Sequence, residues 1–124
     1  MTSLQLARKI AKFMSDKQAE DVLILDLRDL TTLADYFVIA TGTVDVHLKA
    51  IVDHVERSLR SLDEAMRANH LEGYTHLRWV LLDYGDVVAH VFQPQVREYY
   101  KLEKLWGDAP VERLEASPTT LSSS

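Results

Sequence analysis

The chain has 124 residues, of which 47% are hydrophobic and 27% charged, and its formal net charge is −5. This composition excludes an intrinsically disordered chain, and the length fits one domain with a sizeable core. The absence of cysteine excludes disulfide bonds and thiolate metal sites, and the acidic balance argues against general binding of nucleic-acid phosphates. The apolar runs are far shorter than the roughly 18 residues of a membrane helix, so we expect a soluble, cytoplasmic protein.

The first half of the chain is predicted to hold a helix, two strands and a long helix. Apolar residues recur at helical spacing from Leu4 to Met14, with basic residues opposite, which predicts a short amphipathic helix. The apolar runs from Asp21 to Arg28 and from Asp35 to Thr41 are typical of buried strands. A clear amphipathic helix follows from Val44 to about Glu64, and the hydroxyl of Thr43 is expected to cap it.

Two further apolar runs, residues 78–84 and 87–93, predict a β-hairpin around the turn pair Gly85-Asp86. A two-residue turn at this pair fixes the register of the two strands. It places opposite one another Leu82 and Ala89, Leu81 and His90, and Trp79 and Phe92. A short edge strand is expected within residues 66–72.

Pro94 is expected to open a last helix, because its fixed φ suits the first helical turn. The helix would run to Trp106 and end at Gly107. The order of elements predicts an α/β fold, in which a single domain of residues 1–115 packs helices on one mixed β-sheet. The long helix from Val44 would be the crossover to the later strands. Residues 116–124 are rich in Ser and Thr and are expected to form a disordered tail.

The acidic residues of the hairpin have two interpretations. Asp83 and Asp86 flank the turn closely enough to share a metal ion, with His90 as a further ligand. Aspartate is also a common turn residue that binds its own backbone amides, and we favour this interpretation. No Asp-x-Asp or Asp-x-Glu pair occurs in the chain, so the paired carboxylates that hold catalytic metals in nucleotidyltransferases are missing.

Other candidate sites are weaker. His47 and His54 lie two helical turns apart, roughly 10 Å along the axis, which is too far for one zinc ion. His90 lies within a strand with no nucleophile in a recognisable setting, so we expect a partly buried histidine that is hydrogen-bonded to a neighbour. The turn Thr41-Gly42-Thr43 lies where phosphates often bind, but it has one glycine and no following lysine. We expect it only to reverse the chain and cap the helix.

The segment from Trp79 to Asp86 is the strongest candidate for a binding surface. Along a strand, side chains alternate between the two sheet faces: Trp79, Leu81 and Asp83 on one, Val80, Leu82 and Tyr84 on the other. Both faces are largely apolar, so each needs a cover. A strand buried on both sides is one interpretation. If one face is uncovered, an aromatic side chain with acidic neighbours fits a basic protein partner.

Three motifs stand out: ADYFVIATGTVDVH at residues 34–47, WVLLDYGDVVAHVF at 79–92 and REYYKLEKLW at 97–106. Together they resemble the ribosomal silencing factor family, also called the Iojap family, which includes a mitochondrial ribosome-assembly relative. The similarity spans roughly residues 4–109, almost the whole domain.

The resemblance implies a protein that binds the large ribosomal subunit through that subunit's fourteenth protein. The bound factor sterically blocks joining to the small subunit, represses translation when nutrients are scarce, and assists large-subunit biogenesis. The implied fold resembles nucleotidyltransferases without their activity, with no metal or cofactor. The implied contact residues are Trp79, Val80, Leu81, Leu82, Asp83, Tyr84, Gly85 and Asp86.

Val44 and Val46 depart from the family pattern, which often has Ser and Arg there, and they are expected to extend an apolar surface. The alternative function is an enzyme that acts on nucleotides or RNA through a metal at Asp83, Asp86 and His90. A homodimer that pairs the apolar strand face across a two-fold axis is a further alternative. We expect neither membrane association nor sequence-specific nucleic-acid binding.

Overall fold

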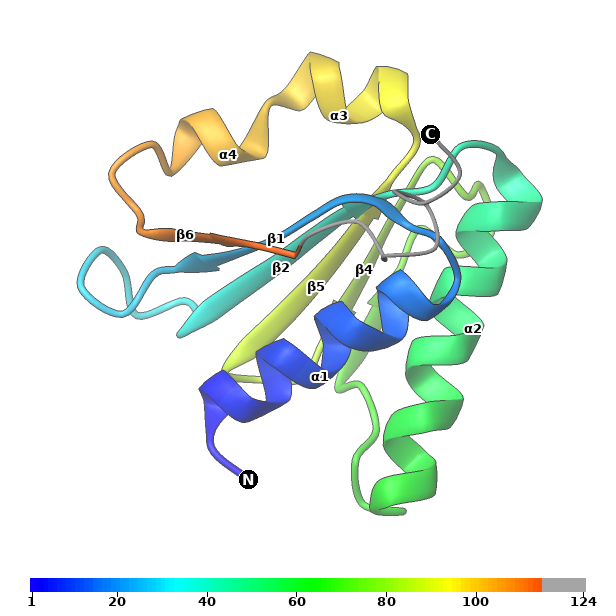
Figure 1. Cartoon of the computed structure of the whole chain (residues 1–124), viewed down its shortest axis with the longest axis horizontal. Coiled ribbons are helices and arrows are strands. Elements are labelled where there is room, and N and C mark those ends of the chain that lie inside the picture. Colours follow the sequence, from blue (N-terminus) through cyan, green and yellow to red (C-terminus); the bar gives the residue numbers. More distant parts are fainter. Residues whose placement is uncertain (115–124) are drawn as a thin grey trace, which may run out of the picture.

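A six-stranded mixed sheet forms the centre of the computed structural model, which describes residues 1–114 (Figure 1). Its strand order is β3-β4-β5-β2-β1-β6, and only the β2–β5 pair is parallel. The elements are α1 (Ser3–Asp16), β1 (Glu20–Asp26), β2 (Tyr36–Thr41), α2 (Asp45–Leu62), β3 (His70–Glu72), β4 (Trp79–Asp83), β5 (Val87–Phe92), α3 (Pro94–Tyr100), α4 (Leu102–Leu105) and β6 (Val111–Arg113). Among the described helices, none has the length and apolar character to cross a membrane.

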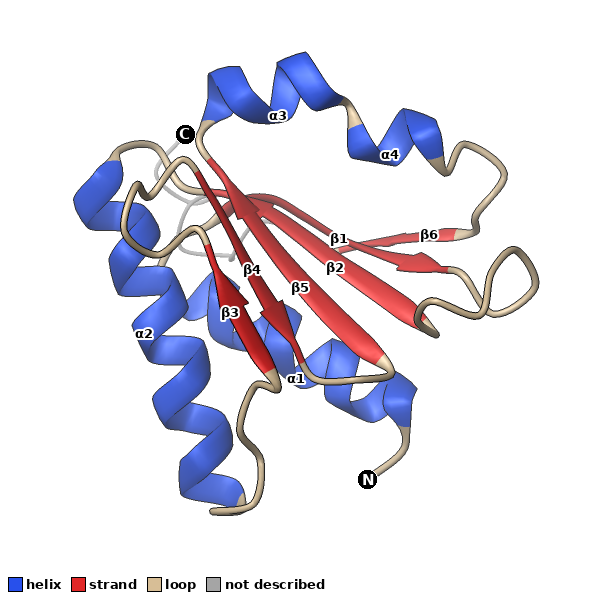
Figure 2. Ribbon diagram, turned by 180° about the vertical axis from the view of Figure 1, so that it is seen from behind, coloured by secondary structure: helices blue, strands red, loops and turns tan. Residues whose placement is uncertain are grey.

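The helices lie on both sides of the sheet. α1 and α2 cover one face, here called the α1–α2 face, and the shorter pair α3 and α4 lies over the other, the α3–α4 face (Figure 2). Strand β5 alternates between them: Val87, Ala89 and Val91 enter the core under α1 and α2, whereas Val88 and Phe92 belong to the core under α3 and α4. Both cores are apolar because the central strands are buried on both faces.

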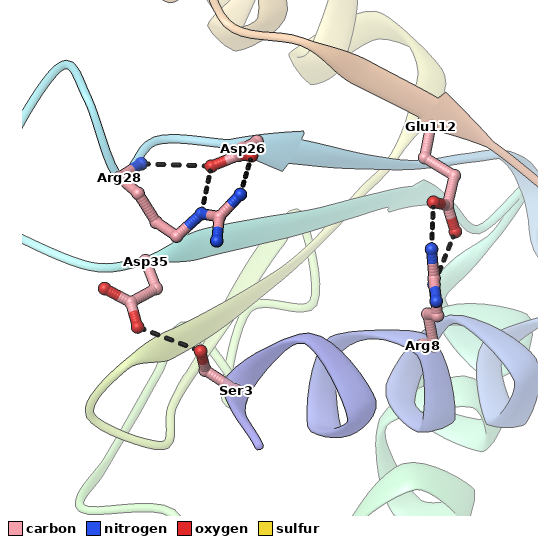
Figure 3. Close-up of polar contacts among 6 residues, drawn as sticks. All are labelled: Ser3, Arg8, Asp26, Arg28, Asp35 and Glu112. Carbon is pink, nitrogen blue, oxygen red and sulfur yellow. Dashed lines mark hydrogen bonds and ion pairs between the residues drawn. The ribbon is translucent and has the colours of Figure 1, made fainter.

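Helix α1 is attached to the sheet by its apolar stripe, which is fully buried from Ala7 to Met14. Polar contacts add to this at the start and in the middle of the helix (Figure 3). Ser3 Oγ donates to Asp35 Oδ2 at 2.9 Å, and the Arg8 guanidinium makes a bidentate pair with Glu112 of β6 at 2.8 and 3.0 Å. Exposed ion pairs of this kind contribute about 1 kcal/mol or less, so burial of the stripe dominates.

Most of the predicted elements are confirmed. The first helix, both early strands, the long helix and a short edge strand lie where the sequence placed them, within a few residues at the ends. The hairpin register is also confirmed, with Leu81 opposite His90 and Trp79 opposite Phe92. Gly85 adopts a φ of +88° in the turn, a conformation that glycine reaches without strain. Helix α2 crosses from β2 to the edge strand β3, and the chain returns through β4 to β5, which pairs in parallel with β2.

The predicted cap of the long helix was wrong. Val44, in extended conformation, is the N-cap, and it makes no side-chain cap hydrogen bond. The Thr43 amide instead donates to His47 Nδ1 at 2.9 Å, so a ring on the first helical turn satisfies this backbone group. His47 Nε2 also lies 2.7 Å from the carbonyl oxygen of Lys17 and thereby links α2 to the end of α1.

The last predicted helix is interrupted, and one strand was missed. Lys101 has a φ of +48°, which ends α3 and redirects the chain into α4. The break lets Leu102 and Trp106 pack on the α3–α4 core. Strand β6 then pairs with β1. It has only three exposed residues with a charged centre, so no apolar pattern marks it in the sequence. The predicted tail, residues 116–124, lies outside the described residues.

Candidate partner-binding site

An aromatic cluster lies where the β4–β5 hairpin meets α3. The ring of Trp79 packs on Phe92 with centroids 4.7 Å apart, on Tyr100 at 5.0 Å and on His90 at 5.9 Å. The register puts Trp79 directly opposite Phe92, which brings the two rings together on the α3–α4 face. The cluster is therefore built by strand pairing and completed by the helix that Pro94 begins.

Part of this cluster is open to solvent. Trp79 is half-buried, while Tyr99 and Tyr100 on α3 are 80% and 54% exposed. A cavity of about 500 Å³ lies beside them, lined by Gly73, His76, Arg78, Trp79, Gln95, Val96, Tyr99 and Tyr100. Large aromatic side chains at the edge of a cavity are the residue types that dominate protein–protein interfaces.

Strand β4 divides the predicted contact residues between two environments. Trp79, Leu81 and Asp83 lie on the α3–α4 face and are half-buried, so β4 is not fully covered on this face. Val80 and Leu82 have no exposed surface, because they pack in the core under α1 and α2. Their side chains cannot contact a partner, so the structure corrects the predicted contact set at these two positions.

The remaining predicted residues follow β4. Tyr84 is half-buried beside the core under α1 and α2, and burial raises the pKa of its phenol. Gly85 and Asp86 form the exposed turn. Asp83 Oδ1 accepts the Gly85 amide hydrogen at 2.8 Å, as expected for an aspartate that stabilises its own turn.

Tyr99 and Tyr100 are site residues that the sequence reasoning assigned differently. The sequence placed both within the predicted last helix, residues 94–106, and gave them no role in binding. The structure exposes both, because α3 has only seven residues and turns a different side to the sheet. Adjacent residues lie about 100° apart around a helix axis, so the short helix α3 covers one part of its surface and leaves these two rings outside it.

The three residues of the alternative metal site do not form one. Within residues 1–114, no group of three or more His, Asp or Glu side chains is placed to hold a metal ion. His90 is 3% exposed in the sheet, where its Nδ1 accepts the indole hydrogen of Trp79 at 3.1 Å. The expectation of a histidine bonded to a neighbour is confirmed, and its burial is more complete than predicted.

Comparison with known proteins decides the family. The whole chain, residues 1–124, matches the family described as "Ribosomal silencing factor during starvation". The chain belongs to the ribosomal silencing factor family. It is 40% identical over 115 residues to ribosomal silencing factor RsfS of Bacillus subtilis, covering 93% of this chain and 96% of that protein.

Two further proteins, one of them a solved structure, are similar to this silencing factor family member. A mouse protein named mitochondrial assembly of ribosomal large subunit protein 1 is 31% identical over 101 residues, 78% of this chain and 43% of the mouse protein. The crystal structure of a Chromobacterium violaceum protein superimposes with a TM-score of 0.82 and 34% identity, covering 86% of this chain and 88% of the other. The α/β fold with a mixed sheet is thus shared with a solved structure.

The family motif around the turn before α2 has a structural role here. Thr41 is buried, and its hydroxyl accepts a hydrogen bond from Arg97 at 2.8 Å. A Cβ at Gly42 would lie 2.9 Å from Leu48 Cα, so glycine is needed for close approach to α2. The departures Val44 and Val46 are 58% and 78% exposed. They add apolar surface at this end of the molecule, as predicted.

The buried His90 has a consequence for stability. Burial lowers the pKa of His90 to about 4, so the folded protein keeps this ring neutral where the unfolded chain protonates it. Below about pH 6.5 the unfolded state binds the additional proton, and the free energy of unfolding should fall by roughly 3 kcal/mol between pH 6.5 and 4.

Urea unfolding at pH 7.5, 6.0, 5.0 and 4.5 measures this loss. The His90→Phe variant should show a flatter dependence over the same range, whatever its absolute stability. The pKa of the Asp26 carboxyl is lowered beside Arg28, and that of Glu112 is lowered beside Arg8. These carboxyl groups change the free energy of unfolding only at lower pH, so they do not account for a loss of stability near pH 6. If the free energy of unfolding of His90→Phe fell with pH as steeply as that of the wild type, His90 would not be the cause of the loss.

Proposed function

We propose that this protein binds the large ribosomal subunit through that subunit's fourteenth protein and sterically prevents joining to the small subunit. It thereby represses translation in the cytoplasm under starvation and assists large-subunit biogenesis. Membership of the silencing factor family over the whole chain is the observation that carries this proposal. The name of the mouse relative supports the part on biogenesis.

The surface of the α3–α4 face is suited to this role. Trp79, Tyr99 and Tyr100 supply apolar area around a cavity, and Asp83 and Asp86 add negative charge along the same hairpin. The chain as a whole has a net charge of −5, which complements a basic ribosomal protein. We propose a binding role without catalysis, on a fold that resembles nucleotidyltransferases but lacks their paired aspartates.

The central test is subunit joining. Purified protein added to separated ribosomal subunits should reduce the joined-ribosome peak of a sucrose gradient in proportion to its concentration, and should itself sediment with the large subunit. Sedimentation equilibrium of the protein alone determines whether a homodimer forms. Unchanged joined-ribosome peaks at saturating protein would rule out the proposed function.

The acidic hairpin should act on the rate of association. Replacing both Asp83 and Asp86 with Asn retains the side-chain oxygen that accepts the Gly85 amide, so the turn is preserved. We expect association with large subunits to slow several-fold and its salt dependence to weaken, with little change in dissociation.

The matched control is the double variant Asp63→Asn/Glu64→Gln at the end of α2. It removes the same number of negative charges at a place away from the hairpin. Stopped-flow or surface-based kinetics at two salt concentrations would measure the effect. A change confined to the dissociation rate would mean that the two aspartates stabilise the turn and do not steer the partner.

A further inference from the structure

The charges of the β4–β5 hairpin are divided between its two ends. Asp83 and Asp86 lie at the turn, whereas His76 and Arg78 lie just before Trp79, where β4 begins. Since each strand residue advances the chain by about 3.3 Å, the two ends of β4 are roughly 13 Å apart. A single charged group of a partner therefore cannot complement both ends.

The cavity beside the aromatic cluster lies at the cationic end of the hairpin. His76 and Arg78 line it, and both are exposed. Within residues 1–114, no Asp or Glu is among its lining residues, and neither cation forms an ion pair. A basic side chain of a protein partner would thus meet no opposite charge here, in contrast to the turn with its two aspartates.

Tyr99 adds a flat surface to the same cavity. Its ring meets that of Tyr100 edge-on with centroids 5.0 Å apart, and Tyr100 packs in turn on Trp79 at 5.0 Å. Tyr99 itself is 80% exposed and lies outside both apolar cores. Most of this ring is therefore open to a flat group, in a cavity whose volume of about 500 Å³ is typical of small-ligand sites.

A nucleotide fits this combination of groups better than a peptide does. Its base has a π surface that stacks on tyrosine, and its phosphate has the negative charge that the Arg78 guanidinium binds. A peptide needs two side chains, one aromatic and one acidic, to make the same contacts, and both lose rotamer freedom on binding. Gln95 also lines the cavity, and its carboxamide can both donate to and accept from the edge of any base.

We infer that this cavity binds one unpaired nucleotide of ribosomal RNA, whose base stacks on Tyr99 and whose phosphate contacts Arg78. The inference rests on the proposed function for the source of the RNA, but not for the chemistry of the cavity. It assigns the acidic turn to the basic protein partner and the other end of the hairpin to RNA. The net charge of −5 argues against binding along a phosphate backbone, but one nucleotide needs no such extended surface.

Short RNA tests the chemistry without ribosomes. In protein labelled with ¹³C-tyrosine, single-stranded tetraadenylate should shift the ring resonances of Tyr99 and Tyr100 saturably. The resonances of the other three tyrosines, Tyr36, Tyr74 and Tyr84, are internal controls and should not move. No saturable shift, or equal shifts of all five tyrosines, would overturn the inference.

Two further ligands separate the base from the charge. A ribose–phosphate chain of the same length without bases, and an acidic aromatic peptide that alternates Glu and Phe, should each bind about tenfold more weakly than tetraadenylate. Equal affinity for the chain without bases would mean that no base stacks on Tyr99. Equal affinity for the peptide would make an acidic protein segment the ligand, and either result overturns the inference.

Two variants locate the contacts. Tyr99→Ala should weaken binding of tetraadenylate about tenfold, the effect of losing one stacked base. Arg78→Gln should lower the slope of log affinity against log salt concentration by about 0.7, the value for one phosphate of a single strand. Leu105→Ala on α4 and Arg57→Gln on α2 are matched controls, since both residues are exposed and neither lines the cavity. An unchanged affinity in Tyr99→Ala, or an unchanged slope in Arg78→Gln, would contradict the assignment.

Cross-linking connects the cavity to the ribosome. A photoreactive phenylalanine analogue at position 99, in complexes with purified large subunits, should cross-link to ribosomal RNA. Cross-links to ribosomal protein alone would overturn the inference and leave the proposed function intact. If wild-type protein binds no subunits, the proposed function fails, while the tetraadenylate result still decides the chemistry of the cavity.

Discussion

Replacing Trp79 with Ala should weaken binding to large ribosomal subunits about thirtyfold or more, the effect of losing ~2 kcal/mol at the centre of an interface. Trp79 is half-buried and provides the largest ring of the aromatic cluster, in contact with Tyr100, which is itself 54% exposed. A partner that covers this face would bury the rest of the indole ring. Co-sedimentation with large subunits over a range of protein concentrations measures the affinity.

The structure also predicts a cost in stability. A fully exposed Trp79 would leave the melting temperature almost unchanged, but the ring packs on Phe92 and donates to His90. Truncation should therefore lower the free energy of unfolding by roughly 1–3 kcal/mol, less than the 3–5 kcal/mol of a fully buried tryptophan.

Trp79→Phe is the matched control, since it keeps an aromatic ring on Phe92 while it removes the indole N–H and part of the ring area. It should retain more stability and more affinity than Trp79→Ala. A folded Trp79→Ala protein that binds subunits with wild-type affinity would refute the assignment of this site, although not the family membership.

Replacing Arg97 with Met should have the largest effect on stability among the polar residues of the α3–α4 face. Arg97 is 9% exposed and joins three segments: Nη1 donates to the Asp21 carbonyl and to Thr41 Oγ1, and Nε donates to Glu103 at 2.9 Å. Asp21 lies near the start of β1, at an irregularity of the strand, and has a φ of +48°. The guanidinium thus holds α3 and α4 against the sheet.

Removing it would leave Glu103 without its ion-pair partner, and the Asp21 carbonyl and Thr41 Oγ1 without this donor. We expect a loss of roughly 2–3 kcal/mol in the free energy of unfolding, below the 3–5 kcal/mol of a fully buried pair because Glu103 is partly exposed. Because α3 carries Tyr99 and Tyr100, binding to large subunits should fall as well.

The double variant Arg97→Met/Glu103→Met separates the two causes. If the uncompensated carboxylate causes the loss, the second substitution should restore part of the stability, as apolar replacements of buried pairs often do. Urea unfolding gives the stabilities, and hydrogen exchange over residues 94–105 reports on the attachment of the two helices. A single variant with wild-type stability would show that Arg97 does not anchor them.

The sequence by itself determined most of the elements and the two faces of the β4–β5 hairpin. Alternation in WVLLD and the turn pair Gly85-Asp86 predicted the register in which Trp79 meets Phe92, because side-chain period and turn length are local properties. Helical spacing placed α1 and α2 for the same reason. The three motifs indicated the family that the comparisons establish.

The tertiary structure alone decided how the α3–α4 face is covered. The break at Lys101, the exposure of Tyr99 and Tyr100, and the pairing of β6 with β1 depend on contacts between distant segments, such as Arg97 with Asp21. The unpaired Nε2 of His90 could not be predicted, since it results from a bond to Trp79 eleven residues away and from burial by neighbouring strands. Local patterns encode which side chains share a face, whereas burial and pairing depend on what the rest of the chain places over it.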